Sequence, residues 1–441
     1  MRSNILKSDS QIARLINLES QRQREVLEMI PSENYASAAV REALGSVLTN
    51  KYSEGYPRKR YYQGNRYIDE IEELATQRAK KLFDVPHANV QPYSGSPANS
   101  AVYMALLAPG DTIMGLKLSA GGHLTHGHPH VTFSGTFYRS AQYDVEADGT
   151  IDMDHAAALA QKEKPKMIVV GTTAYPRFFD WKTWRVIADS VGAYFLADIS
   201  HIAGLIVGGV HPSPAPYADV LMATTHKTLR GPRGAILMVT GPGLVKDPAM
   251  GEKIDKAVFP GLQGGPHDNV TAAIAVCLHE AAQPAFKTYA KQVVDNARVL
   301  ANTLKRQGST LSTNGTDNHL MVVDLRPQGV IGNIAAEALE AAGIVVNRNS
   351  VPHDPNPPFY PSGIRLGTPA ITTRGMKERE MQQIGSWIVQ VIKEVSHYCL
   401  PEAKEERVAF LKKVRVELQK NKQLQAIHRS VTILTSKFPV P

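Results

Sequence analysis

Apolar residues recur at three- and four-residue steps in the stretch that begins at Ile68 and continues through Ile71 and Leu74 to Leu82. This spacing predicts an amphipathic helix. Residues 181–191 have helical spacing as well, and the first 50 or so residues read as a helical arm.

Five short apolar runs, each bounded by turn residues, follow the first of these helices. They cover residues 112–114, 167–170, 194–197, 220–223 and 235–239. Each is too short for a stable helix and is rich in β-branched or bulky residues, which favours strands. Strands alternating with helices indicate a largely parallel sheet covered on both faces. Such sheets carry their sites at the carboxyl ends of the strands.

The pattern changes after about residue 271. A long helix is expected over 271–285, a strand over 320–325, and a closing helix from 402 to about 420. We therefore expect an α/β protein in three parts. These are an N-terminal helical arm (1–50), a large α/β domain (51–275) and a small C-terminal α+β domain (276–441).

Composition narrows the class of protein. No run approaches the roughly 18 consecutive apolar residues of a membrane span, and the polar first residues do not resemble a signal peptide, so we expect a cytoplasmic protein without a membrane partner. The net charge of +8 could serve nucleic acid or anionic small molecules. Lys and Arg are scattered without a nucleic-acid-binding fingerprint, which favours small molecules. Cys277 and Cys399 have no spacing that predicts a disulfide framework or zinc site.

A lysine follows the apolar run 220–223, in the string TTHKT at 224–228. If its amine is desolvated in a cleft, Lys227 can form an imine, although a lone loop lysine is more often a surface residue. Asp198 directly follows the run 194–197. A carboxylate there can keep the ring nitrogen of pyridoxal phosphate (PLP) protonated, or simply cap a helix. His201, three residues on, could face the same ligand.

A run of mostly small residues at 94–99 precedes an apolar helical stretch, as in a phosphate cradle or an ordinary turn and cap. His123 is flanked by glycines, which would let a flat ligand approach and stack on the imidazole. A metal site with His126, His128 and His130 is the alternative, but no carboxylate is close in sequence. Arg365 lies among small residues and could bind a substrate carboxylate bidentately or form a structural salt bridge.

At these residues the chain resembles the serine hydroxymethyltransferase family over nearly its whole length. The matching strings are SENY at 32–35, NKYSEGYP at 50–57, RYY at 60–62, QPYSGS at 91–96, GGHLTHG at 121–127, DISH at 198–201, THKT at 225–228, FPGLQGGP at 259–266 and NRNS at 347–350. Departures at 176–179, 200 and 222–223 remove no catalytic group but leave the breadth of substrates open.

The resemblance implies a fold-type I PLP enzyme that forms a homodimer or a dimer of dimers, with active sites at the subunit interface. The implied reaction is the reversible transfer of the serine hydroxymethyl carbon to tetrahydrofolate, which gives glycine and 5,10-methylenetetrahydrofolate. A folate-independent PLP aldolase or a transaminase is the nearest alternative. A nucleic-acid-binding protein that has lost catalysis is a further one, and the intact Lys227 and Asp198 argue against it.

The same resemblance implies roles for individual residues. The catalytic residues would be Lys227 (covalent link to PLP), Glu54 (acid/base), His123 (ring stacking), Asp198 (ring nitrogen) and Tyr62. Further cofactor contacts would be Tyr52, Ser94, Gly95, Ser96, Thr173, His201, His226 and Gly265, with Tyr52 and Gly265 reaching in from the neighbouring subunit. Ser32, Tyr62 and Arg365 would bind the substrate. Folate contacts would be Glu54, Tyr61, Leu118, Gly122, His123, Leu124 and Asn349.

Overall fold

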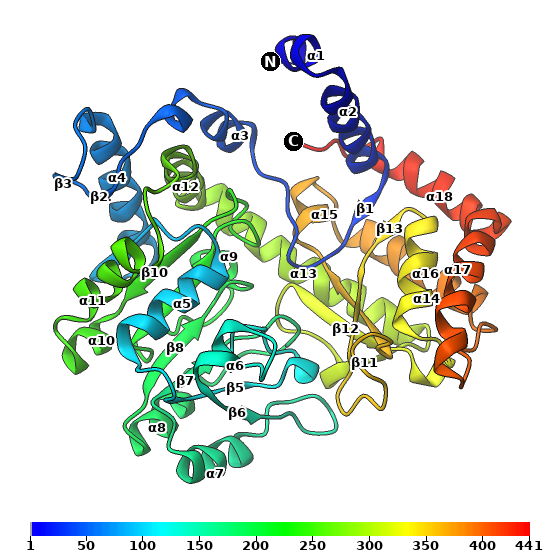
Figure 1. The fold of residues 1–441 in the computed structure, drawn as a ribbon. Helices are drawn as coiled ribbons and strands as arrows, with labels where there is room; N and C mark the ends of the chain where they lie inside the picture. The colour runs from blue at the N-terminus through cyan, green and yellow to red at the C-terminus, as the bar shows by residue number, and fades with distance from the viewer. Residues whose placement is uncertain (1) are drawn as a thin grey trace.

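The computed structural model describes residues 2–441, which form a larger and a smaller body (Figure 1). The larger body is built on a seven-stranded sheet of order β4-β10-β9-β8-β7-β5-β6. Its strands are β4 (His87–Asn89), β5 (Thr112–Leu116), β6 (Arg139–Tyr143), β7 (Met167–Val170), β8 (Tyr194–Asp198), β9 (Val220–Thr224) and β10 (Ala235–Val239). Six of these seven strands run in the same direction, and β10 pairs antiparallel with both β4 and β9. The predicted largely parallel α/β sheet is therefore confirmed.

Successive residues of the central strands point into two different cores. Ile168 and Leu221 pack in one core, whereas their chain neighbours Met167 and Val220 pack in the other. This alternation is the two-residue period of a strand buried on both faces. The helices of this body are α3 (Ala38–Leu44), α4 (Arg66–Phe83), α5 (Gly95–Leu106), α6 (Phe133–Phe137), α7 (Met153–Glu163), α8 (Trp181–Ser190), α9 (Ala203–Val207), α10 (Gly241–Lys246), α11 (Met250–Lys256) and α12 (Asp268–Ala281).

The smaller body holds an antiparallel sheet of order β11-β12-β15-β14. Its strands are β11 (Thr310–Leu311), β12 (Leu320–Asp324), β14 (Asn347–Asn349) and β15 (Gly363–Gly367). Its helices are α14 (Gly332–Ala341), α15 (Pro369–Thr373), α16 (Glu378–Glu394), α17 (Lys404–Lys420) and α18 (Lys422–Thr435). Short 3-10 or π turns lie at Val47–Asn50, Leu118–Ala120, Ala257–Leu262, Ser312–Asn314 and Arg326–Gln328.

Helix α13 (Pro284–Arg306) belongs to both bodies and runs between them in Figure 1. Phe286 and Val294, in its first half, pack in the core of the larger body. Ala297 and Leu304, in its second half, pack in the core of the smaller body. The two cores are thus joined by one unbroken helix, and the domain boundaries at 50 and 275 stay a proposal.

The N-terminal segment is only partly helical. Helices α1 (Arg2–Ser8) and α2 (Ser10–Glu25) project from the bodies (Figure 1). The next residues form β1 (Leu27–Glu28), which pairs in parallel with β13 (Ile344–Val345) of the smaller body. A two-stranded hairpin, β2 (Gly55–Tyr56) and β3 (Lys59–Arg60), then leads into α4. The first 50 residues therefore contain a strand that the helical pattern does not predict.

The five predicted strands of the large sheet are confirmed, with ends that differ by at most two residues. The single helix predicted over 271–285 is wrong, because α12 ends at Ala281 and α13 begins at Pro284. Proline suits a first helical position and not an interior one. The chain also continues past residue 420 into α18, since Asn421 accepts hydrogen bonds from the amides of the next helix and starts it. None of the helices in residues 2–441 combines the length and the apolar run needed to cross a bilayer.

Candidate active site

A hollow of about 270 Å³, open solvent included, lies at the carboxyl ends of β7, β8 and β9. Its lining is Gly95, His123, His126, Thr172, Thr173, Asp198, Ser200, His201, Met222, Thr224 and Lys227. Six of the sequence-predicted site residues are thereby brought together, as the strand-end rule leads one to expect.

Asp198 is the last residue of β8 and is buried. Its Oδ2 accepts a hydrogen bond from Nε2 of His126 at 2.9 Å and another from Nδ2 of Asn99 at 3.2 Å. Its Oδ1 accepts one from the amide of Ser200 at 3.1 Å. Burial alone would raise the pKa of Asp198, but the bond from His126 and the nearby cationic groups outweigh it and hold that pKa well below its usual range. The hollow therefore contains a permanent negative charge.

Lys227 lies in the loop between β9 and β10, and its amine shares the hollow with this carboxylate. Burial lowers the pKa of Lys227 to about 8, against the opposing pull of Asp198, with Arg365 and Arg233 adding to the decrease. An amine that loses its proton near neutral pH is a nucleophile able to condense with an aldehyde.

The imidazole of His123 is held in place by its neighbours. Its Nδ1 accepts a hydrogen bond from the amide of Thr125 and lies 2.7 Å from the hydroxyl of the same residue. That hydroxyl in turn accepts from Nδ2 of Asn99, which also reaches Asp198. Burial and the neighbouring His126 lower the pKa of His123 to about 4. His123 thus offers a neutral, oriented ring face beside the carboxylate.

The N-terminus of α5 closes one side of the hollow. A Cβ atom on Gly95 would lie 2.8 Å from Cγ2 of Thr224, so a side chain at this position would crowd the end of β9. Ser94 precedes the helix without a side-chain cap, Ser96 is exposed, and the buried hydroxyl of Thr224 has no hydrogen-bond partner among the described residues. First-turn amides and unpaired hydroxyls of this kind suit a phosphate group. His226, next to Lys227, contacts Nη1 of Arg233 through Nε2 at 3.2 Å.

Arg365 comes from β15 of the smaller body and is buried. Its Nη1 donates to the carbonyl of Thr173, and its Nε donates to Oδ1 of Asn347 at 3.0 Å. Thr173 itself donates to the carbonyls of the Gly121–Gly122 turn. Burial lowers the pKa of Arg365 to about 10, which still leaves it charged near neutral pH. The guanidinium is therefore a fixed cation beside the hollow, with Nη2 free of any hydrogen bond to the described residues.

A second group of sequence-predicted residues lies apart from this hollow. Tyr52, Glu54, Tyr61, Tyr62 and Gly265 contribute nothing to its lining. The hydroxyl of Tyr52 donates to Glu54 at 3.2 Å, and its ring packs edge-on against Tyr62. The rings of Tyr52, Tyr61 and Tyr62 are exposed. These residues form a surface group of their own in the single chain.

The residues assigned to folate and substrate flank the hollow or lie outside it. Position 122 must be glycine for steric reasons, because a Cβ atom there would lie 2.0 Å from the carbonyl oxygen of Leu116. Leu124 is exposed, and Leu118 and Ser32 are partly buried. Asn349 lines a small neighbouring hollow together with Gly121 and Ala174.

Five residues of the site had no role assigned from the sequence: Asn99, Thr172, Ser200, Met222 and Thr224. His126 was weighed only as a metal ligand, yet it is the closest partner of Asp198. Its spacing of three from His123, in a glycine-rich turn, was the available signal. Asn99 stands alone as a polar residue on the buried side of α5, which also marks it. No group of three or more His, Cys, Asp or Glu side chains in residues 2–441 is arranged to hold a metal ion.

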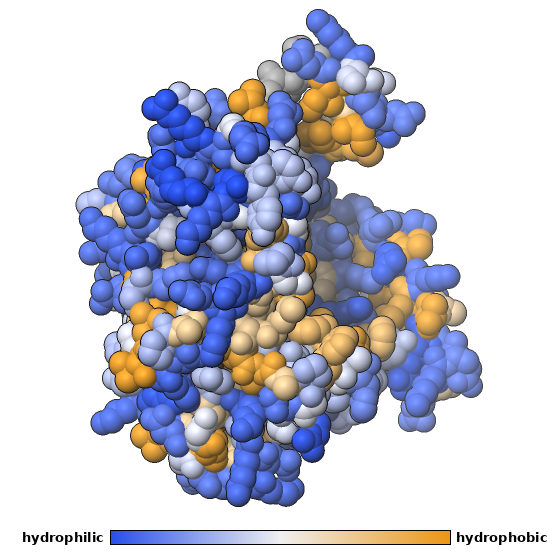
Figure 2. All heavy atoms as spheres, turned by 60° about the vertical axis from the view of Figure 1, so that its left-hand side comes forward, coloured by the Kyte–Doolittle hydropathy of each residue, from blue (hydrophilic) through white to orange (hydrophobic). Residues whose placement is uncertain are grey.

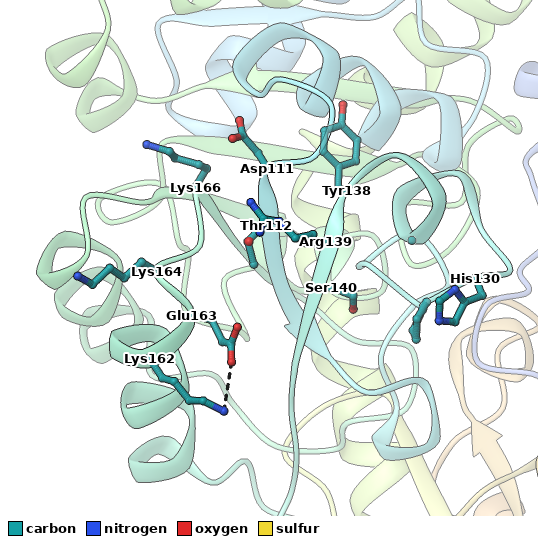
Figure 3. A pocket seen from close by; sticks show the side chains of 12 residues that line it. Asp111, Thr112, His130, Tyr138, Arg139, Ser140, Lys162, Glu163, Lys164 and Lys166 are labelled. Atoms are coloured by element: carbon teal, nitrogen blue, oxygen red, sulfur yellow. Dashed lines mark ion pairs between the residues drawn. The ribbon is translucent and has the colours of Figure 1, made fainter.

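A larger hollow lies at the opposite, amino edge of the sheet (Figure 3). It is formed where β5 and β6 begin and where α7 leads into β7, and it mixes Lys162, Lys164, Lys166 and Arg139 with Asp111 and Glu163. Ligands of open α/β sheets bind at the carboxyl edge. The hollow at the amino edge is therefore not the candidate active site, although it is the larger of the two.

Comparison with known proteins gives a consistent family. A family model described as serine hydroxymethyltransferase matches residues 5–388. A protein named serine hydroxymethyltransferase from Acidothermus cellulolyticus is 53% identical over 435 residues, covering 98% of this chain and 96% of the relative. Proteins of the same name from Sorangium cellulosum and Acidobacterium capsulatum are 55% and 49% identical, covering 88% and 100% of this chain and 90% and 96% of the relatives.

Proposed function

The chain belongs to the serine hydroxymethyltransferase family, and from that premise we propose that the hollow around Lys227 and Asp198 is its active site. The protein is a fold-type I PLP enzyme that reversibly transfers the hydroxymethyl carbon of serine to tetrahydrofolate and leaves glycine. The observation that carries the site is the meeting of an amine of lowered pKa with a permanently charged, buried carboxylate.

The residues of the hollow suit PLP on each of its polar sides. Lys227 offers a nucleophilic amine to the aldehyde, and Asp198 offers a charge to the ring nitrogen. The α5 N-terminus at Gly95 and Ser96, with Ser94 and the unpaired hydroxyl of Thr224, offers donors to the phosphate. His123 would lie against the ring, and His201, Thr173 and His226 complete the surroundings.

When bound, PLP draws electrons from the substrate bond being broken into its protonated ring. The chain's own residues prepare that step. The guanidinium of Arg365, anchored through Nε and Nη1, binds the carboxylate of serine through its free Nη2, with Ser32 and the partner subunit's Tyr62 in support. This contact orients the amino acid. Asp198 keeps the ring nitrogen protonated because its own carboxyl group stays ionised.

We further propose that the enzyme works as a homodimer with shared active sites. Among the described residues, Asp198 alone supplies a carboxylate to the lining of the hollow, and it is already hydrogen-bonded to His126 and Asn99. A separate acid/base is needed to move the proton of the serine hydroxyl. Glu54, in the exposed group with Tyr52, Tyr61 and Gly265, would supply it from the partner subunit.

The projecting N-terminal helices support this assembly. They expose six large apolar side chains: Ile5, Leu6, Ile12, Leu15, Ile16 and Leu18. Figure 2 shows hydrophobic atoms gathered on this projection. An apolar surface on helices that project away from the rest of the chain suits burial against a second copy of the chain.

Leu118, Gly122, Leu124 and Asn349 would contact tetrahydrofolate. We also propose a cytoplasmic location, which cell fractionation can test.

The test of the proposed function is serine cleavage measured with and without tetrahydrofolate, in enzyme loaded with PLP. We expect formation of glycine and 5,10-methylenetetrahydrofolate that depends on folate and is lost in Lys227→Ala. Cleavage of serine at the same rate without folate would contradict the transferase assignment and favour an aldolase.

A further inference from the structure

Two buried histidines meet where the larger and smaller bodies face each other. His201 lies just past β8, and His319 immediately precedes β12. Nδ1 of His201 lies 3.2 Å from Nε2 of His319. The ring planes differ by 27° and the ring centroids are 5.5 Å apart. A separation of 3.2 Å between two ring nitrogens is that of an N–H···N hydrogen bond. The centroids, 5.5 Å apart, are too distant for the rings to lie face to face in contact.

Both rings are neutral at physiological pH. Burial lowers the pKa of His319 to about 3 and that of His201 well below its usual value, and the cations Arg365 and Lys227 act in the same direction on both. A neutral imidazole carries one N–H and one bare nitrogen. One ring therefore donates and the other accepts. The direction of this bond decides which nitrogen of His201 carries the proton.

The surroundings of His319 favour one direction. Its Nδ1 is buried and has no hydrogen-bond partner among the described residues. If the proton were on that nitrogen, a buried N–H would be left without an acceptor. Buried N–H groups without partners are rarer than under-satisfied acceptors, and a buried donor that loses its partner bears the full cost of desolvation. The proton of His319 therefore belongs on Nε2, the nitrogen that faces His201.

We propose that His319 is a positioning residue whose Nε2–H donates to Nδ1 of His201 and thereby keeps the proton of His201 on Nε2. His201 lines the active-site hollow, and its Nδ1 is occupied, so Nε2–H is the group it presents there. This group donates a hydrogen bond and suits an oxygen acceptor on a ligand. The tautomer does not depend on the reaction. Only the identity of the acceptor, the ring hydroxyl of PLP, rests on the proposed function.

The tautomers can be observed directly by NMR of protein with ¹⁵N-labelled histidine, because protonated and bare ring nitrogens have different shifts. The peaks are assigned from His201→Gln and His319→Gln variants. We expect both rings to be protonated at Nε2, in the PLP-loaded enzyme and in the ligand-free protein alike. Protonation of either ring at Nδ1 would overturn the proposal. The ligand-free spectrum keeps this result separate from any failure of PLP to bind.

Two variants separate positioning from simple packing. His319→Gln keeps an N–H donor toward His201, whereas His319→Leu removes it. We expect His319→Leu to bind PLP about 2- to 12-fold more weakly, the effect of one hydrogen bond, and His319→Gln to stay close to the parent. His155→Gln, an exposed change, serves as the control. Equal weakening in both His319 variants, with equal loss of thermal stability, would show a packing role and overturn the proposal.

Discussion

Lys227 owes its low pKa to burial, which disfavours its charged form more than Asp198 favours it. The neutral amine is the nucleophile, and lowering the pKa from 10.5 to about 8 increases its share at neutral pH, by roughly 300-fold for a shift of this size.

We predict that the rate at which the ligand-free protein captures PLP rises with pH and levels off above about pH 8. Stopped-flow absorbance measures the rate, and borohydride reduction followed by peptide mapping locates the link. Lys227→Ala should give no reducible adduct. A rate that keeps rising tenfold per pH unit up to pH 10 would show that the amine is not desolvated.

Asp198→Asn tests the charge at the other end of the cofactor. Asparagine keeps much of the shape but cannot carry the negative charge that a pyridine nitrogen needs to stay protonated. We expect PLP to remain bound and serine cleavage to slow by roughly 10- to 200-fold, the effect of one charged hydrogen bond.

The matched control for this change is Asp180→Asn. Asp180 is exposed and caps α8 by accepting from the amide of Thr183. Asparagine caps a helix as well as aspartate does, so activity should not change. Comparable losses at both positions would indicate that Asp198 acts on the fold and not on the cofactor.

At the scale of residues, the sequence indicated the groups that directly follow a strand. Asp198 and Lys227 come just after apolar runs, and the strand-end rule brought them together. The sequence could not indicate a role for His319. This residue is 118 positions away from His201, and only the packing of the two bodies brings the two rings together.

At the scale of elements, the hairpin β2–β3 is anchored by one arginine. Nη1 of Arg60 donates to the carbonyls of Ser53 and Gly55, on either side of Glu54. Its Nε and Nη2 bind Asp69 and Glu72 of α4 at 2.9 and 2.7 Å. The Arg60 side chain is only 3% exposed. Removing it would leave the buried carboxylates of Asp69 and Glu72 without their cationic partner.

We predict that Arg60→Met lowers the free energy of unfolding by about 3–5 kcal/mol, as expected when one partner of a buried ion pair is lost. Arg58→Met is the control, since Arg58 pairs with Glu73 at the surface and is 64% exposed. Exposed pairs contribute about 0–1 kcal/mol. Urea denaturation measures both variants, and similar losses in the two would contradict the anchoring role of Arg60.

Elements with a strong internal pattern could be predicted, and those defined by their neighbours could not. The strands β7 and β10 are apolar throughout, and their ends were predicted to the residue. The edge strand β6 has the sequence RSAQY, which alternates buried with more exposed positions and has no apolar run. The two-residue strand β1 exists only because β13 lies beside it.

At the scale of the whole molecule, the shared-site proposal predicts complementation. Mixing Glu54→Gln subunits with Lys227→Ala subunits gives hybrid dimers in which one site carries both defects and the other carries neither. With random exchange about half the dimers are hybrids, so about a quarter of all sites should be intact.

Folate-dependent serine cleavage in the exchanged mixture measures this recovery. Differently tagged chains, purified on one tag and probed for the other, establish that exchange has taken place. If exchanged subunits remained as inactive as their parents, each chain would have to build its site alone.

The continuity of α13 has a mechanical consequence. Its 23 residues form one helix without an interior break, roughly 35 Å long at 1.5 Å per residue. Its two halves are clamped in different cores. A sharp kink in α13 would break main-chain hydrogen bonds. Any hinge between the two bodies must therefore lie in the loops outside this helix. The continuous helix therefore limits how far the loop of Lys227 and the strand of Arg365 can move relative to each other.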